Sequence, residues 1–416
     1  MELARRGPSW RDPILVLGGS LVRTVGLLVQ LVVIARVCGA DLLGVYSFAL
    51  ALTTPLVLTL GWNLRVMLSV DADHQHAWSA YRRLRSTSLV LGLIVALAIC
   101  WWWSTAWQHV ALIMLVYAVK CIESLSELGY GVLQRVGDAR AIATGNALRA
   151  VLVTSGLCLP LVLGTTLEVA VAVQAGASLL AYLTVELPRM RGSLTRWAQG
   201  SPDSMVLFVA AWPLGIAVGA SALGSGMPRL VLTECELIAQ AGALLIVINL
   251  LSPASLAINA MQQAFGARMA DAVRQRDRAH WRQYLRQSIL VGYLACAVVG
   301  VAAWIGLLLL TPILGWQVEI GLPAFIAVVL AGGIQSHQTL LGTGLDSMRR
   351  FASKLMIQVV YLLAVGGLCV ALIPRFGLDG ACLALLGSAV ISLGLTYWST
   401  QRAADELFPQ PLPERS

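Results

Sequence analysis

The stretch Ile14–Val37, ILVLGGSLVRTVGLLVQLVVIARV, carries Arg23 near the middle of an apolar run that is long enough to cross a lipid bilayer. About 20 apolar residues span the hydrocarbon core as a helix, whereas the core of a cleaved signal peptide has only about 7–15. The run therefore predicts a retained first membrane span. A charged side chain inside a span is costly, so Arg23 is expected to face a polar partner or a water-filled cavity.

The rest of the chain repeats this pattern. Of its 416 residues, 58% are hydrophobic and only 12% are charged, whereas a soluble domain carries about 25% charged residues. Basic residues alternate with apolar stretches that are long enough to cross a bilayer, so the net charge of +8 does not indicate a nucleic-acid binder. The composition predicts an all-α polytopic membrane protein.

Twelve stretches are predicted to span the membrane, six in an N-terminal lobe (1–200) and six in a C-terminal lobe (201–416). The expected helices cover residues 13–37, 42–62, 86–105, 107–128, 140–164, 167–187, 204–232, 237–265, 285–310, 313–343, 351–373 and 378–399. The stretch 313–343 is long and could hold a kink near Gly332 and Gly333.

Most of the 29 basic residues fall in loops that this count places on one side of the membrane, together with both termini. The positive-inside rule therefore predicts that the termini and these loops are cytoplasmic. The exceptions that we single out are Arg23, Arg36, Arg149, Arg229 and Arg375.

Several classes of protein are disfavoured by what the sequence lacks. It has no Gly-x-x-x-x-Gly-Lys-[Ser/Thr] loop for ATP, no dinucleotide-binding glycine motif after a strand, and no His/Glu cluster with metal spacing. Its eight cysteines form no Cys-x-x-Cys pair, and most fall in apolar runs. We expect neither a cofactor nor a metal site, and no ATPase within this chain.

The two halves of the chain echo each other. Gly44 precedes Pro55 by the same spacing as Gly242 precedes Pro253, and each glycine follows an arginine at the predicted outer end of a helix. The match predicts two repeats of the same topology, related by an axis along the membrane normal with a central cavity between them.

Two segments resemble those of polysaccharide exporters. Residues 36–52, RVCGADLLGVYSFALAL, resemble their first loop and second helix, and residues 373–384, IPRFGLDGACLA, resemble the turn between their last two helices. Pro374 would end one helix, the glycines would allow a tight turn, and the small residues would let the last helix pack closely. With twelve spans, the chain resembles the Wzx-type O-antigen flippases of the multidrug/oligosaccharidyl-lipid/polysaccharide (MOP) exporter superfamily.

The resemblance implies a MATE-like fold of two six-helix lobes around a central cavity, and transport by alternating access. The implied substrate is an undecaprenyl-diphosphate-linked oligosaccharide, an O-antigen or exopolysaccharide repeat unit, moved from the inner to the outer leaflet of the bacterial inner membrane. The polymerase and chain-length regulator of the same pathway would be its protein partners.

Arg23 is the strongest candidate for contacting such an anionic substrate, with Gln30 two turns away on the same face. The alternative is a structural arginine paired with a carboxylate. In the fourth span, Lys120, Glu123 and Glu127 are spaced three and four residues apart and so share one helix face. If Lys120 pairs with Glu123, Glu127 remains available to bind or carry a proton, unless it lies at the cytoplasmic interface.

Further candidates lie in the fifth and tenth spans. Asn146 and Arg149 are three residues apart and could extend the polar lining for substrate, although Arg149 could instead reach the cytoplasmic end. Asp346 and His337 are candidates for ion coupling, together with Glu123 and Glu127. A lone histidine is more often a hydrogen-bonded core residue, which is the alternative for His337.

Other functions stay open at this point. A multidrug antiporter of the same superfamily should have mainly acidic residues in its cavity, because its usual substrates are cationic. The presence of Arg23 argues against this function. A peptidoglycan-precursor flippase typically has two more spans than we count. A membrane-embedded glycosyltransferase or polymerase would need a large outer loop or an acidic pair, and the predicted outer loops are short.

Overall fold

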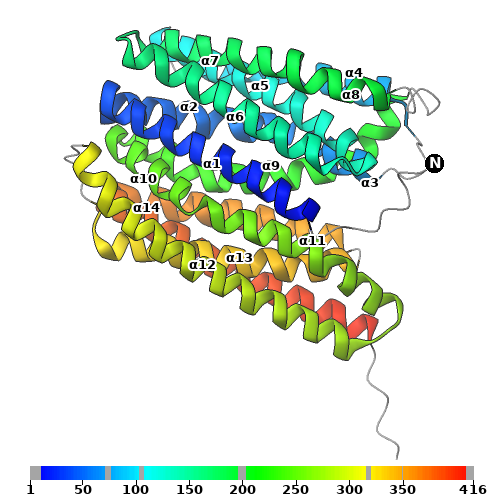
Figure 1. Cartoon of the computed structure of the whole chain (residues 1–416). Coiled ribbons are helices and arrows are strands. Elements are labelled where there is room, and N and C mark those ends of the chain that lie inside the picture. The colour runs from blue at the N-terminus through cyan, green and yellow to red at the C-terminus, as the bar shows by residue number, and fades with distance from the viewer. Residues whose placement is uncertain are drawn as a thin grey trace, which may run out of the picture. The chain divides into compact units, whose positions relative to one another are not determined.

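The computed structural model describes residues 11–70, 76–102, 107–194, 203–314, 320–348 and 350–408. Every regular element within these ranges is a helix (Figure 1). Eleven helices of the described chain are long and apolar enough to cross a membrane, and the last, with 56 residues, is long enough to cross twice. The predicted all-α polytopic architecture is confirmed.

The chain divides into two compact units. The first contains Met1–Asn249 with Pro312–Val318, and the second contains Leu250–Thr311 with Glu319–Ser416. The helices that begin in the first unit are α1 (Arg11–Cys38), α2 (Ala40–Thr59), α3 (Leu64–Val70), α4 (Trp78–Trp102), α5 (Trp107–Val136), α6 (Ala139–Val162), α7 (Leu167–Ala181), η2 (Tyr182–Glu186), α8 (Leu187–Leu194), α9 (Ser204–Glu234) and α10 (Ile238–Leu250).

The sequence instead predicts lobes that meet at residue 200. In the structure, α9 and α10 belong to the first unit, and both contact α2. Ser47 on α2, for example, donates a hydrogen bond of 3.0 Å to the carbonyl oxygen of Ala241 on α10. The division into lobes of six helices stays a prediction.

A turn after α2 directs the chain into the short helix α3. Trp62 and Asn63 adopt positive φ angles of 50° and 47° in this turn, a left-handed conformation that few residues other than glycine adopt. Leu64 and Leu68 of α3 are fully buried and pack with Leu128 of α5. The apolar face of α3 therefore fixes its polar face near α5.

The helix α7 passes directly into a π-helical segment, η2, and then into α8. A π-helical turn holds more residues than an α-helical turn and changes the direction in which the following side chains project. Its last residue, Glu186, is a carboxylate with only 2% of its surface exposed. The segment thus presents a charged group to the interior of the first unit.

The second unit contains α11 (Ser252–Arg274), α12 (Arg278–Leu314), α13 (Leu322–Ser347) and α14 (Phe351–Leu407). Asp277 lies at the start of α12 and accepts a hydrogen bond of 3.0 Å from the backbone amide of His280, which lowers the pKa of its carboxyl group. Within α13, Gln338 accepts a hydrogen bond of 2.8 Å from Ser392 on α14. Hydroxyl and amide contacts of this kind hold helices together in lipid.

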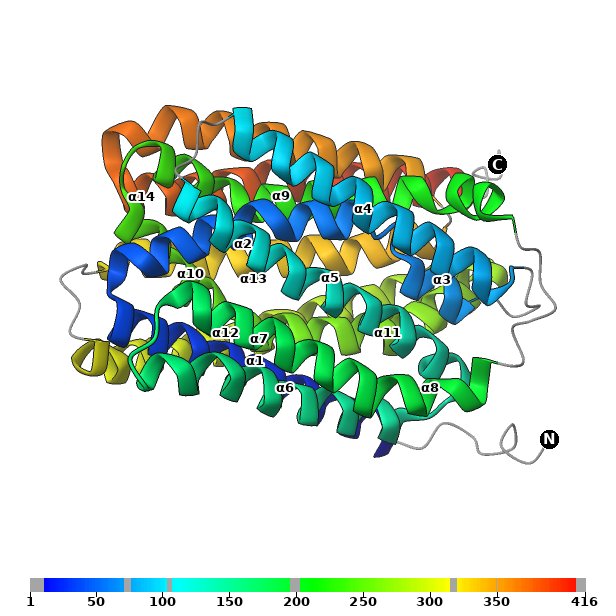
Figure 2. The same cartoon turned by 90° about the horizontal axis from the view of Figure 1, so that it is seen from above.

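The long helix α14 is broken at Gly377, whose φ of 55° and ψ of −128° are not helical. Figure 2 shows its orange and red arms running back beside each other. A β-carbon on Gly380 would lie 2.5 Å from the carbonyl oxygen of Leu372, so the chain approaches itself closely at this turn. The predicted break between the last two spans is confirmed.

Other predicted boundaries differ from the structure. The expected helix 237–265 is interrupted at Leu251, between α10 and α11. The helix expected at 313–343 begins at Leu322 instead, and it continues without a break through Gly332 and Gly333. A helical glycine costs only about 1 kcal/mol relative to alanine, which the surrounding helical hydrogen bonds outweigh, so the two glycines do not end the helix.

Candidate functional site

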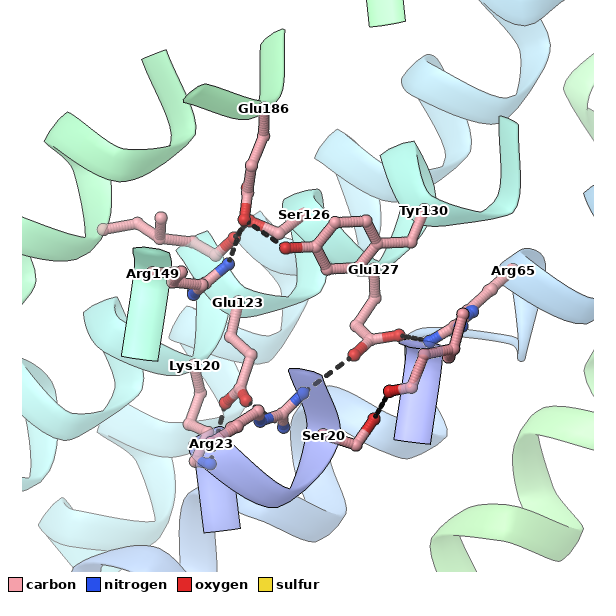
Figure 3. A network of polar contacts seen from close by, with 12 residues as sticks. Ser20, Arg23, Arg65, Lys120, Glu123, Ser126, Glu127, Tyr130, Arg149 and Glu186 are labelled. Atoms are coloured by element: carbon pink, nitrogen blue, oxygen red, sulfur yellow. Dashed lines mark hydrogen bonds and ion pairs between the residues drawn. The ribbon is translucent and has the colours of Figure 1, made fainter. Parts of the chain in front are cut away.

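Arg23 on α1 lies opposite two carboxylates on α5. Its guanidinium group donates to Glu123 and, over 3.2 Å, to Glu127 (Figure 3). Because the two glutamates are four residues apart, they project from one face of α5 and can both reach a single arginine. The structure therefore brings together the groups that the sequence singled out in the first and fourth spans.

Lys120 completes this face of α5. Its ammonium nitrogen lies 2.8 Å from Oε2 of Glu123, as the three-residue spacing predicts. Glu123 is thus held between Lys120 and Arg23.

Arg65 is a further cation that the sequence interpretation placed in a cytoplasmic loop. The turn before α3 and the burial of Leu64 direct Arg65 toward α5, where it pairs with Glu127. The idea that Glu127 remains free is therefore wrong, because two arginines bind it. We call Arg23, Arg65, Lys120, Glu123 and Glu127 the open cluster.

The open cluster is accessible from outside the protein. The side chains of Arg23, Arg65 and Lys120 are 47%, 33% and 24% exposed, although Arg23 and Lys120 lie within apolar helices. Three cations face two carboxylates, which leaves one excess positive charge. Arginine guanidinium groups bind phosphate through two parallel hydrogen bonds, so such a cluster can hold a phosphorylated group.

A second ion pair lies beside the open cluster and is closed to solvent. Glu186 accepts a hydrogen bond of 2.6 Å from the hydroxyl group of Tyr130 and pairs with Arg149 over 3.5 Å (Figure 3). Only 10% of the Arg149 side chain and 1% of the Glu186 side chain are exposed. We call Arg149 and Glu186 the closed pair. Glu186 therefore holds Arg149 inside the first unit, away from solvent.

Tyr130 links the two groups of charges. Its hydroxyl group binds Glu186, while its ring lies 6.0 Å from the guanidinium carbon of Arg65. Tyr130 is three residues beyond Glu127 on α5 and is 2% exposed. Through Tyr130, α5 therefore contacts the closed pair as well as contributing three residues to the open cluster.

Two predicted substrate contacts lie apart from the open cluster. Gln30 is buried. It donates a hydrogen bond of 3.1 Å to Thr154 on α6 and accepts a hydrogen bond of 2.9 Å from Gln174 on α7. It links three helices instead of sharing the surroundings of Arg23. Asn146 is also buried, and its side-chain oxygen has no partner among the described residues.

The two remaining ion-coupling candidates belong to the second unit. Asp346 pairs with Lys354 over 2.6 Å. The Nδ1 atom of His337 lies 2.6 Å from the hydroxyl oxygen of Tyr293. This contact agrees with the alternative that His337 is a hydrogen-bonded core residue. Neither belongs to the open cluster, which lies in the first unit.

Three charged residues of this region were missed by the sequence interpretation: Arg65, Arg85 and Glu186. Arg85 is 4% exposed and donates a hydrogen bond of 2.8 Å to Ser124 on α5. It forms no ion pair with another described residue. Both arginines looked like loop residues because they lie just beyond predicted span ends. Glu186 lies inside the predicted span 167–187, and a carboxylate within an apolar stretch was the signal that could have identified it.

No protein-family model matches the chain. Over 379 residues it is 19% identical to the capsular polysaccharide biosynthesis protein CapF of Staphylococcus aureus, covering 89% of this chain and 94% of that protein.

Solved structures are similar over almost the whole chain. A multidrug resistance MATE family transporter of the MOP superfamily, in its outward-facing conformation, superposes with a TM-score of 0.66 at 13% identity, covering 96% of each chain. A mutant of the Vibrio cholerae MATE transporter VcmN gives a TM-score of 0.66 at 13% identity, covering 96% of this chain and 98% of that one. This multi-pass membrane protein therefore has the fold of the MATE transporters of the MOP superfamily.

Proposed function

We propose that this chain is a flippase for an undecaprenyl-diphosphate-linked oligosaccharide, an O-antigen or exopolysaccharide repeat unit. The observation that carries the proposal is the open cluster, in which three partly exposed cations face two carboxylates. A diphosphate is the part of such a substrate that needs cations. The weak similarity to a capsular polysaccharide biosynthesis protein supports the same assignment.

In this proposal the diphosphate binds Arg23, Lys120 and Arg65, while the polyprenyl chain stays in lipid. Gln30 and Arg149 act indirectly, by linking helices of the first unit. Asn146 stays a candidate substrate contact. Transport moves the substrate from the inner to the outer leaflet of a bacterial inner membrane by alternating access, with both termini in the cytoplasm. The polymerase and chain-length regulator of the pathway would receive the product.

Ion coupling is a further part of the proposal. Glu123 and Glu127 belong to the open cluster and are the nearer candidates. Asp346 and His337 stay candidates in the second unit.

Substitution of Arg23 by alanine and by lysine tests the proposal in the native host. The alanine variant should lose surface polysaccharide and accumulate lipid-linked repeat units on the inner leaflet, at the same protein level as wild type. Lysine keeps the charge but not the two parallel hydrogen bonds, so it should restore only part of the activity. Arg83→Ala is the control, because Arg83 is an exposed residue at the start of α4. Wild-type polysaccharide in both Arg23 variants would contradict the assignment.

Export of cationic compounds is a second candidate function. It is favoured by the MATE fold and by the two carboxylates of the open cluster. A cationic substrate would need Glu123 and Glu127 more than Arg23. Resistance to cationic drugs that falls in Glu123→Gln and Glu127→Gln but persists in Arg23→Ala would support it.

A further inference from the structure

We infer that Glu123 and Glu127 occupy the place of the substrate diphosphate when the open cluster is empty. Substrate then binds by displacing these carboxylates from the cations, and it leaves as the carboxylates return. The inference rests on the proposed function and concerns how the same site releases its substrate.

Every cation of the open cluster already has a carboxylate partner. Arg23 donates to both glutamates, Arg65 pairs with Glu127, and Lys120 pairs with Glu123. A phosphate oxygen therefore finds no cation in the cluster whose charge is not already shared with a carboxylate. It must compete with the carboxylate oxygens for the positive charge of these side chains.

The cations keep a partner during the exchange. Carboxylate and phosphate oxygens are both ionised acceptors that fit the planar fork of arginine. When Arg23 or Arg65 gives up a charge-assisted hydrogen bond with a glutamate, a hydrogen bond with the diphosphate can replace it. No cation has to be left buried without a partner during the exchange.

Exposure distinguishes these carboxylates from that of the closed pair. The side chains of Glu123 and Glu127 are 21% and 29% exposed, so a ligand can reach the atoms that they bind. Glu186 is 1% exposed and bound by Tyr130, which leaves no access for exchange. A ligand can therefore compete for the cations of the open cluster, whereas it cannot reach the ion pair of Arg149 and Glu186.

The displaced carboxylates keep their negative charge close to the bound diphosphate. Like charges that are a few ångströms apart repel each other more strongly near a protein than in bulk water. The two glutamates therefore weaken substrate binding and speed its release. A flippase needs this weakness, because a site that binds tightly in one leaflet cannot release its substrate into the other.

The experiment replaces each glutamate by glutamine in the full chain, reconstituted in nanodiscs. Glutamine keeps the size and the acceptor oxygen but removes the charge. Equilibrium titration with fluorescent undecaprenyl diphosphate should show affinity about tenfold higher for Glu127→Gln and for Glu123→Gln, because one repelling charge within about 6 Å is gone. Dissociation should slow by a similar factor, and surface polysaccharide in the native host should fall.

Glu406→Gln is the matched control. Glu406 also forms an exposed ion pair, 2.5 Å from Arg350, but in the second unit. The same change of charge there should leave affinity and dissociation rate unchanged.

Unchanged or weaker binding in the folded glutamine variants would overturn the inference. If one variant does not fold, by size-exclusion chromatography and thermal unfolding, the other decides. Binding to Arg23→Ala separates the two proposals. If wild type binds the probe and Arg23→Ala does not, the site stands even where the glutamine variants show no gain. If Arg23→Ala binds as wild type does, the proposed site itself fails.

Discussion

Gly242 on α10 lies directly against Gly44 on α2, so that a β-carbon on Gly242 would be 3.0 Å from the amide nitrogen of Gly44. A β-carbon on Gly44 would in turn collide with the carbonyl oxygen of Ile238. These are the two glycines that the sequence repeat equates. Equivalent positions that touch are expected close to the axis that relates two repeats.

Gly44→Ala should destabilise the first unit. The added methyl group meets backbone atoms, which cannot move aside as a flexible side chain can, and overpacking typically costs about 1–3 kcal/mol. Thermal unfolding in detergent should show a lower midpoint. Gly18→Ala on α1 is the control, because no neighbouring atom lies within 4 Å of its added carbon. A Gly44→Ala midpoint equal to that of Gly18→Ala would show that the contact is loose.

Removal of Glu186 should cost more than any single change in the open cluster. Glu186→Ala leaves the guanidinium group of Arg149 buried without its carboxylate, a loss of about 3–5 kcal/mol for a buried pair. The double variant Arg149→Met/Glu186→Leu removes both charges and should recover much of the stability. Chemical or thermal unfolding of the three proteins measures this. A single variant as stable as wild type would mean that water reaches Arg149.

Arg65 should matter for substrate although it lies outside the longer helices. Arg65→Ala removes one of three cations, and we expect affinity for undecaprenyl diphosphate to fall about tenfold, as for the loss of one charged hydrogen-bonding partner. Arg83→Ala should bind as wild type does. Equal affinity in both variants would restrict the site to Arg23 and Lys120.

The turn of α14 should depend on glycine at position 380. An alanine there would place its β-carbon 2.5 Å from the carbonyl oxygen of Leu372, so we expect a loss of about 1–3 kcal/mol and a lower unfolding midpoint. Gly367→Ala in the same helix has open space around the new carbon and should be neutral or slightly stabilising. The comparison isolates close approach from the general preference of helices for alanine.

The fold and part of the site could be predicted because both depend on local spacing. Apolar runs of spanning length fixed the helices, and the three- and four-residue spacing of Lys120, Glu123 and Glu127 fixed their shared face. That Arg23 meets these glutamates could not be predicted, because pairing between distant helices has no period along the chain. The structure shows the carboxylate pairing that was the alternative for Arg23, on a side chain that is also half-exposed.

Arg65, Arg85 and Glu186 were missed for a different reason. The place of Arg65 depends on the left-handed turn at Trp62 and Asn63, and that of Glu186 on the π-helical segment η2. Neither feature leaves a signature in hydrophobic periodicity. Arg65 and Arg85, which lie just beyond predicted span ends, therefore look like loop residues until the backbone is known.

The π-helical segment has one more consequence. It holds a surplus residue relative to a regular helix, and deleting one residue between 182 and 186 would let α7 and α8 join as a continuous α-helix. Each residue of an α-helix turns the chain by about 100°, so the deletion would change the register of the side chains on one side of it. A substitution at Glu186 changes one side chain, whereas an insertion or deletion in this segment would change the direction of every side chain on one side of it. We therefore expect the length of the segment between Ala181 and Leu187 to be as tightly constrained among working variants as the identity of Glu186 itself.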